Sequence, residues 1–225
     1  PASMKGQGKV ALVHGYCSGG SPFPEEHFTE SIAFSDPNQS RSNDAFAQLL
    51  WKFIEPHSKT GVSLVGHSQG GIASTHLYTF YWSAVDGHSI FDDNNRIIQS
   101  VGTPYSGTAL AGVIASIGKS IGIGCGDNKD LTREGAELWK ATIPQHARKA
   151  VYYYTTQYDD WNWCVLAAQA VLSFPNDGTA EQKYNHLDGA TFVNHKKKFC
   201  HTDNMKFPPQ CKDSTRNTEL NEKAP

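Results

Sequence analysis

The feature that most restricts how this chain can fold is a serine set between glycines, in the pentapeptide GHSQG at residues 66–70. The apolar run at residues 62–65 predicts a buried strand before it, and residues 71–81 have the spacing of a helix after it. A strand that passes so sharply into a helix leaves no space for side chains beside the serine, which explains the glycines. Such a turn lifts the Ser68 hydroxyl clear of a sheet. The pattern therefore predicts a nucleophilic serine.

The order of elements along the 225 residues favours an α/β fold. Strand-like runs alternate with helix-like runs, which is typical of a mostly parallel sheet with helices on both faces. Strands are expected at 9–13, 62–65, 97–101, 150–155 and 191–193, and helices from Asn43 or Asp44 to Ile54 and at 71–81, 109–117, 130–148 and 165–172. We expect one domain over residues 1–225, with a polar, frayed tail from about Asp213.

Three stretches resemble the bacterial lipases and carboxylesterases of the α/β-hydrolase superfamily. They are VGHSQGG at 65–71, VHGY at 13–16, similar to the His-Gly oxyanion loop of that superfamily, and VGTPYSG at 101–107, similar to its Gly-Thr-Pro turn. The resemblance covers residues 8–110 well and the rest loosely, and the compact bacterial lipases are the most similar subgroup. It implies the α/β-hydrolase fold and a serine esterase or lipase.

The resemblance also implies an oxyanion hole, in which backbone N–H groups stabilise the charge that develops on a carbonyl oxygen. One donor is the residue after the nucleophile, here Gln69. The other comes from the loop after the first strand, which places it at Tyr16.

A catalytic serine needs a histidine to take its proton and a carboxylate to orient that histidine. In the superfamily the acid and then the histidine follow the serine. Asp177, in the sequence NDG at 176–178, resembles the acid of many bacterial lipases and is our preferred residue. Asp160 and then Asp159, after the strand at 150–155, are the alternatives.

The base could be His186, His195 or His201. His201 stands 24 residues beyond Asp177, which leaves room for a short helix, a strand and a loop, and it is our choice. His186 would precede the last strand if Asp177 is the acid, although it would suit Asp160. His195 would lie at the end of that strand with little loop.

Five cysteines leave at least one unpaired in a monomer. We expect Cys200–Cys211, beside His201, and Cys125–Cys164, with Cys17 as a buried thiol, although sequence alone leaves the pairing open. Two disulfides favour an oxidising compartment and hence a secreted, periplasmic or extracellular protein. The alternative is five reduced cysteines in a cytosolic enzyme.

Composition excludes several classes of function. A net charge of −2 gives no basic surface for nucleic acid, and no stretch approaches 18 apolar residues, so no membrane span is expected. Residues 1–10 lack the apolar core of a signal peptide, which we expect to have been removed. No CxxC or HExxH spacing occurs, so neither a metal ion nor a cofactor is expected.

Together these observations predict hydrolysis of a small-molecule or lipid ester through an acyl-enzyme on Ser68. Aromatic side chains that could line the substrate site are Phe23, Tyr105 and Trp161, together with Tyr16, Phe28 and Trp163. Two alternatives remain open. The same residues could act on a thioester, amide or polyester, or the chain could be a binding or maturation module on an inactive hydrolase scaffold.

Overall fold

The computed structural model describes residues 9–18, 20–38, 40–81, 96–111, 128–159, 162–166, 168–201 and 208–224. A sheet with the strand order β2-β1-β3-β4-β5-β6 crosses the molecule, and every neighbouring pair in it is parallel. The strands are β1 (Lys9–Val13), β2 (Ser31–Ala33), β3 (Val62–His67), β4 (Ile98–Val101), β5 (Val151–Gln157) and β6 (Thr191–Lys197). Parallel strands need crossover connections, which here carry most of the helices.

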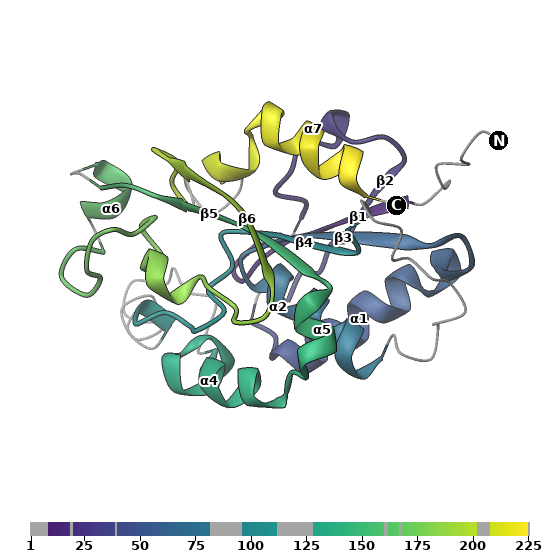
Figure 1. Ribbon diagram of the computed structural model, residues 1–225, viewed down its shortest axis with the longest axis horizontal. Coiled ribbons are helices and arrows are strands. Elements are labelled where there is room, and N and C mark those ends of the chain that lie inside the picture. Colours follow the sequence, from purple (N-terminus) through teal and green to yellow (C-terminus); the bar gives the residue numbers. More distant parts are fainter. Residues whose placement is uncertain are drawn as a thin grey trace.

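Helices cover both faces of this sheet, which confirms the predicted fold class (Figure 1). On one face lie α1 (Asn43–Ile54), α2 (Gln69–Phe80), α4 (Arg133–Thr142) and α5 (Gln145–Lys149), and on the other lies α7 (Ser214–Lys223). The other helices within the described residues are short: α6 (Trp163–Leu166), η1 (Glu25–His27), η2 (Glu55–Thr60), η4 (Lys129–Leu131), η5 (Gln182–Tyr184) and η6 (Pro209–Cys211).

The two-residue period of the strands divides the apolar core in two. On β1, Ala11 and Val13 belong to the cluster that contains the buried side chains of α1 and α2. Val10 and Leu12 belong to the opposite cluster, with Leu220 of α7. Successive side chains of a strand point to opposite faces, so a strand buried on both sides must be apolar throughout. Burial of apolar side chains on both faces stabilises the sheet. The loops at the ends of its strands carry the candidate site.

Several predicted boundaries differ from the structure. Ser42 is the N-cap of α1, since its side chain accepts the N–H of Ala45, and Asn43 is the first helical residue. The helix expected at 130–148 is divided into α4 and α5. Ile143 has an extended backbone, as the residue before a proline prefers, and Pro144 caps the next helix.

The shorter strands and helices also differ from those predicted by the local sequence pattern. The three-residue strand β2 was not predicted, because three residues carry too little periodicity to be recognised. The helix expected at 165–172 is shortened to α6, and β6 runs four residues beyond its predicted end at 193. Most of the helix expected at 109–117 lies outside the described residues.

The prediction of a frayed tail from Asp213 is wrong. The Asp213 side chain accepts the N–H of Arg216 and so caps α7. Leu220 of this helix is fully buried against the sheet. The sequence did not predict this helix because few of its positions face the core, so its composition is mostly polar.

Candidate active site

Ser68 lies on the sharp turn between β3 and α2. Its backbone has a φ of 54° and a ψ of −127°, a conformation that costs free energy in a residue with a side chain. The glycines make this turn possible. A Cβ atom on Gly66 would lie 2.6 Å from the carbonyl carbon of Gly70, and one on Gly70 would lie 2.5 Å from the carbonyl oxygen of His14. The predicted strand, turn and helix are therefore present, with the serine at the turn.

The structure brings together the three residues chosen from the sequence. The Ser68 Oγ lies 2.9 Å from Nε2 of His201, and Nδ1 of His201 lies 2.8 Å from Oδ2 of Asp177. All three residues are buried, and Asp177 is fully so. A neutral His201 with its proton on Nδ1 donates to Asp177 and leaves Nε2 free to accept from the Ser68 hydroxyl.

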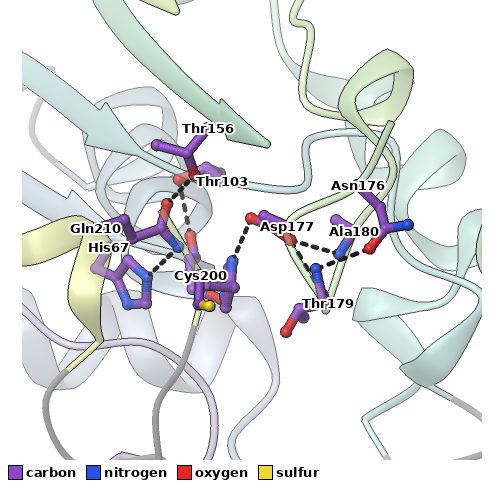
Figure 2. Close-up of polar contacts among 12 residues, drawn as sticks. His67, Thr103, Thr156, Asn176, Asp177, Thr179, Ala180, Cys200 and Gln210 are labelled. Carbon is purple, nitrogen blue, oxygen red and sulfur yellow. Dashed lines mark hydrogen bonds and ion pairs between the residues drawn. The ribbon is translucent and has the colours of Figure 1, made fainter. Parts of the chain in front are cut away.

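Backbone groups hold the Asp177 carboxylate in place. Its Oδ1 accepts the N–H groups of Thr179 and Ala180, at 3.0 and 2.9 Å (Figure 2). The Asp177 carbonyl accepts the N–H of His201 at 2.8 Å, so acid and base are joined through backbone as well as side chain. Gly178 has a φ of +90°, and a Cβ atom there would lie 2.5 Å from the Cys164 carbonyl oxygen. The NDG sequence therefore forms a turn that only glycine can complete.

The alternative acids and bases lie elsewhere. Asp159 is paired with Lys197 at the surface, and Asp160 lies outside the described residues. His186 bonds to the hydroxyl of Tyr153, and His195 bonds to the hydroxyl of Thr155. Among the described residues, none of these groups contacts Ser68.

The loop after β1 packs directly against Ser68. A Cβ atom on Gly15 would lie 2.6 Å from Cβ of Ser68, so this position needs glycine. Nε2 of the buried His14 accepts the N–H of Asp36 at 3.2 Å, and Nδ1 therefore donates to the Gly15 carbonyl at 2.8 Å. Burial is the main cause that lowers the pKa of His14, which keeps the ring neutral. The Tyr16 N–H, in the same trans peptide, points away from this ring.

Gln69 begins α2, where backbone N–H groups have no acceptor within the helix. Its side chain is tied down elsewhere, because its Nε2 donates to the Arg41 carbonyl at 2.9 Å and to Oδ1 of Asn43 at 3.1 Å. The backbone at the start of α2 is thus anchored beside Ser68.

The predicted disulfides are wrong. Cys164 is bonded to Cys200, so neither Cys200–Cys211 nor Cys125–Cys164 is correct. Cys17, expected as a free thiol, is disulfide-bonded, whereas Cys211 is the buried free thiol. Cys125 lies outside the described residues. Pairing depends on which loops meet in space, and spacing along the chain does not report this.

Three of the six aromatic residues expected to line the site, Tyr105, Phe23 and Phe28, belong to the buried core. Tyr105 is fully buried and bonds to the Ser100 hydroxyl at 2.8 Å, and burial raises the pKa of its phenol. Phe23 packs against Phe28 in the cluster beneath α7. The burial of Tyr105, Phe23 and Phe28 in the core gives no support to the prediction that they contact substrate, and Trp161 lies outside the described residues.

Four polar residues at the site were not predicted: His67, Thr103, Thr156 and Gln210. Thr103 donates to the Ser68 carbonyl at 2.9 Å. Gln210 lies between His67 and Thr156, hydrogen-bonded to both (Figure 2). His67 could have been noticed, since it stands next to Ser68 in the motif. The sequence gives no reason to expect Gln210 at the site, because it lies 142 residues beyond Ser68 in the chain.

The part of the chain that the structure describes contains no group of three or more histidine, cysteine or acidic side chains placed to hold a metal ion. Among the same residues, none of the helices has the length and apolar character that a bilayer crossing demands.

Residues 5–224 match the protein family described as "Conditioned medium factor C-terminal domain". A protein of Dictyostelium discoideum named "Conditioned medium factor" is 49% identical to the chain over 219 residues. That alignment covers 96% of the chain and 30% of the relative, so the chain spans less than a third of the relative's length.

Solved structures of bacterial lipases and esterases have a similar fold. The mature lipase BlEst2 of Bacillus licheniformis superposes with a TM-score of 0.64 at 19% identity, over 88% of this chain and 86% of that one. The Staphylococcus hyicus lipase gives 0.56 at 15% identity, over 99% and 94%. EstA of Clostridium botulinum gives 0.57 at 13% identity, over 89% and 83%. At such identities the likeness supports the predicted α/β-hydrolase fold and no specific activity.

Proposed function

The chain belongs to the family of conditioned medium factor C-terminal domains, and we propose that it is a serine hydrolase that cleaves carboxylic esters. The observation that carries the proposal is the unbroken line of hydrogen bonds from Ser68 through His201 to Asp177. Each of these residues comes from a different loop at the end of a different strand. A purely structural hydrogen-bond network would not require the strained backbone at Ser68.

The reaction follows from this geometry. His201 Nε2 takes the hydroxyl proton as Ser68 Oγ bonds to the ester carbonyl carbon. The tetrahedral intermediate then collapses, and the alcohol leaves with the proton from His201, which produces an acyl-enzyme on Ser68. His201 then takes a proton from water as the water oxygen attacks the acyl carbonyl carbon. The bond from that carbon to Ser68 Oγ breaks, Oγ regains a proton from His201, and the carboxylic acid is released. Asp177 keeps the Nδ1 proton of His201 in place and stabilises the imidazolium that forms twice in the cycle.

The oxyanion would be held by the backbone N–H groups of Tyr16 and Gln69. Support comes from the contact between Gly15 and Ser68, and from the anchored start of α2. Each such donor typically contributes a few kcal/mol to catalysis.

The substrate is proposed to be a small-molecule or lipid ester. Thioester, amide and polyester substrates could use the same three residues, since each forms a tetrahedral intermediate at a carbonyl carbon. No cofactor takes part in these steps.

A second candidate is a binding module on a hydrolase scaffold. It is favoured by the name of the Dictyostelium relative, which describes a factor and mentions no hydrolysis. That name also suggests a protein found outside the cell. The Cys164–Cys200 disulfide agrees with an oxidising compartment, and we propose that this chain too is secreted.

The test is hydrolysis of p-nitrophenyl esters, from acetate to palmitate, by the wild type and by Ser68→Ala. The hydrolase proposal expects turnover by the wild type and its loss in Ser68→Ala, and the chain-length profile would separate esterase from lipase. No turnover on any ester, thioester or amide would overturn the proposal. The binding module would then be favoured if Ser68→Ala keeps the binding properties of the wild type.

A further inference from the structure

Gln210, in η6, is completely buried, and it contacts three separate segments next to the candidate triad. Its side-chain Nε2 lies 3.0 Å from Nε2 of His67. Its Oε1 accepts the hydroxyl of Thr156, at the end of β5, at 2.5 Å. Its backbone N–H donates to the Cys200 carbonyl at 3.3 Å. Figure 2 shows Gln210 between His67, Thr156 and Cys200.

These contacts involve the immediate neighbours of the two reacting residues. His67 directly precedes Ser68, and Cys200 directly precedes His201. The rings of His67 and His201 also touch, with their centroids 4.7 Å apart. A shift of Gln210 would therefore be passed on to Ser68 and His201 together.

Gly102 lies directly against the Gln210 amide. Gly102, after β4, has a φ of +59°, and a Cβ atom there would lie 2.4 Å from Oε1 of Gln210. Any larger residue at 102 would displace the amide. The ends of β3, β4 and β5 thus all meet at this one side chain.

The contact with Gln210 also fixes the protonation of His67. Thr156 donates to Oε1, so the amide presents its NH2 group to His67, whose Nε2 must accept. His67 is therefore neutral, with its proton on Nδ1. Burial lowers the pKa of His67 well below 6.5, and the nearby His201, Arg216 and His14 act in the same direction. A charged ring in this place would oppose the imidazolium that His201 forms during the reaction.

We propose that Gln210 is a positioning residue for catalysis, which holds neutral His67 against His201 and keeps the base at hydrogen-bonding distance from Ser68. The inference rests on the proposed hydrolase function. It assigns no contact with substrate to Gln210.

The test compares Gln210→Met and Thr156→Val with the wild type. Gln210→Met keeps the length of the side chain and the backbone bond to Cys200, but loses both side-chain hydrogen bonds. Thr156→Val keeps its shape and removes the hydroxyl that orients the amide. The matched control is Gln99→Met, because Gln99 is also fully buried and its side chain donates to the Leu220 carbonyl at 2.7 Å, away from the candidate triad.

Two readouts are measured: kcat and KM for a p-nitrophenyl ester, and the 15N and low-field proton NMR signals of the histidine rings. We expect Gln210→Met to lower kcat about 10- to 100-fold with little change in KM, as displacement of a catalytic group does. The wild-type His67 should show a proton on Nδ1 only. In Gln210→Met it should show a mixture of forms, and the His201 Nδ1 proton should shift. Thr156→Val should change kcat and the histidine ring signals in the same direction as Gln210→Met does. Gln99→Met should change neither kcat nor the ring signals.

The inference is overturned if Gln210→Met leaves the His67 and His201 signals as in the wild type, or if Gln99→Met lowers kcat equally. The NMR readout needs no turnover. An inactive wild type would therefore refute the proposed function, while the ring signals would still decide whether Gln210 positions His201.

Discussion

The two oxygens of the Asp177 carboxylate have different tasks. Oδ1 is occupied by the backbone N–H groups of Thr179 and Ala180, so only Oδ2 faces His201. A carboxylate accepts hydrogen bonds and cannot donate them, so Nδ1 of His201 must carry the proton. Nε2 is then the acceptor that the Ser68 hydroxyl needs.

Asp177→Asn tests this directly. The amide oxygen can still accept from Thr179 and Ala180, but its NH2 group would then face Nδ1 and force the proton of His201 onto Nε2. We expect kcat for ester hydrolysis to fall by roughly 10⁴-fold, as in serine proteases with the same change, with little change in the thermal midpoint. The control is Asp188→Asn, at an exposed position outside the site. Near-normal kcat in Asp177→Asn would exclude Asp177 as the orienting acid.

At the scale of elements, the acid and the base belong to loops that the disulfide clamps together. Cys200 precedes His201, and the Cys164 carbonyl lies against Gly178 of the Asp177 turn. The crosslink closes a loop of 36 residues, which in chain-entropy terms stabilises the fold by about 3–4 kcal/mol. It therefore acts on stability and on the geometry of the site together.

The double variant Cys164→Ser/Cys200→Ser should lower the thermal midpoint and, at temperatures where it remains folded, also lower kcat. Loss of the clamp lets the Asp177 turn and His201 move apart, and even about 1 Å of displacement is costly for catalysis. Circular dichroism and ester hydrolysis would be measured side by side. If the folded variant retained wild-type kcat, the disulfide would have no part in positioning the site.

Helix α7 covers the opposite face of the sheet, and Leu220 is its fully buried apolar anchor. We expect Leu220→Ala to lower the free energy of unfolding by about 2–5 kcal/mol, because it leaves a cavity against β1 and β3. Urea unfolding measures this, with Glu222→Ala on the exposed side of the helix as the control. A change as small as that of the control would mean that α7 contributes little to the fold.

At the scale of the whole molecule, the sheet determines where the site can form. The strands are parallel, so their carboxyl ends meet at one edge, and residues 68, 177 and 201 converge there from loops far apart in sequence. Chain order and loop length favour His201 as the base, whereas the choice of Asp177 rests on the resemblance of the NDG sequence to the acid-bearing stretch of bacterial lipases. The elbow was predictable because strand, glycines and serine all lie within a few residues.

What could not be predicted depends on contacts across the fold. Cys164 lies in α6 and Cys200 lies in the loop after β6. The fold brings these two segments together, and the spacing of the cysteines along the chain does not reveal it. Gln210 reaches His67 from a loop with no motif of its own. Tyr105 follows the conspicuous Gly-Thr-Pro turn, yet it points into the core. Residue type and position in sequence are not enough to tell a core aromatic from one in a substrate site.

Stability should fall as the pH is lowered below about 6.5, because two buried histidines resist protonation. Burial is the main cause that lowers the pKa of both His14 and His67. Below their ordinary value of 6.5 the unfolded chain takes up protons that the folded chain does not. The contribution of the two histidines to the free energy of unfolding is thus complete above pH 6.5. It is lost as the pH falls toward their folded-state pKa values.

Each such histidine changes the free energy of unfolding by about 1.4 kcal/mol per pH unit within that range. Urea unfolding at about pH 7.5 and about pH 5.5 measures the effect, well above the range in which carboxylates titrate. Equal stability at the two pH values would show that both rings are protonated as readily in the folded chain as in the unfolded one.

The most direct test of the central claim is covalent labelling by a fluorophosphonate, followed by mass spectrometry of the intact chain and of its peptides. Such reagents react with a serine whose hydroxyl is activated by a neighbouring base. The account predicts one adduct per chain, located on Ser68, absent from Ser68→Ala and greatly slowed in His201→Ala. No adduct, or an adduct on another residue, would contradict the claim that Ser68 is the nucleophile of a working hydrolase.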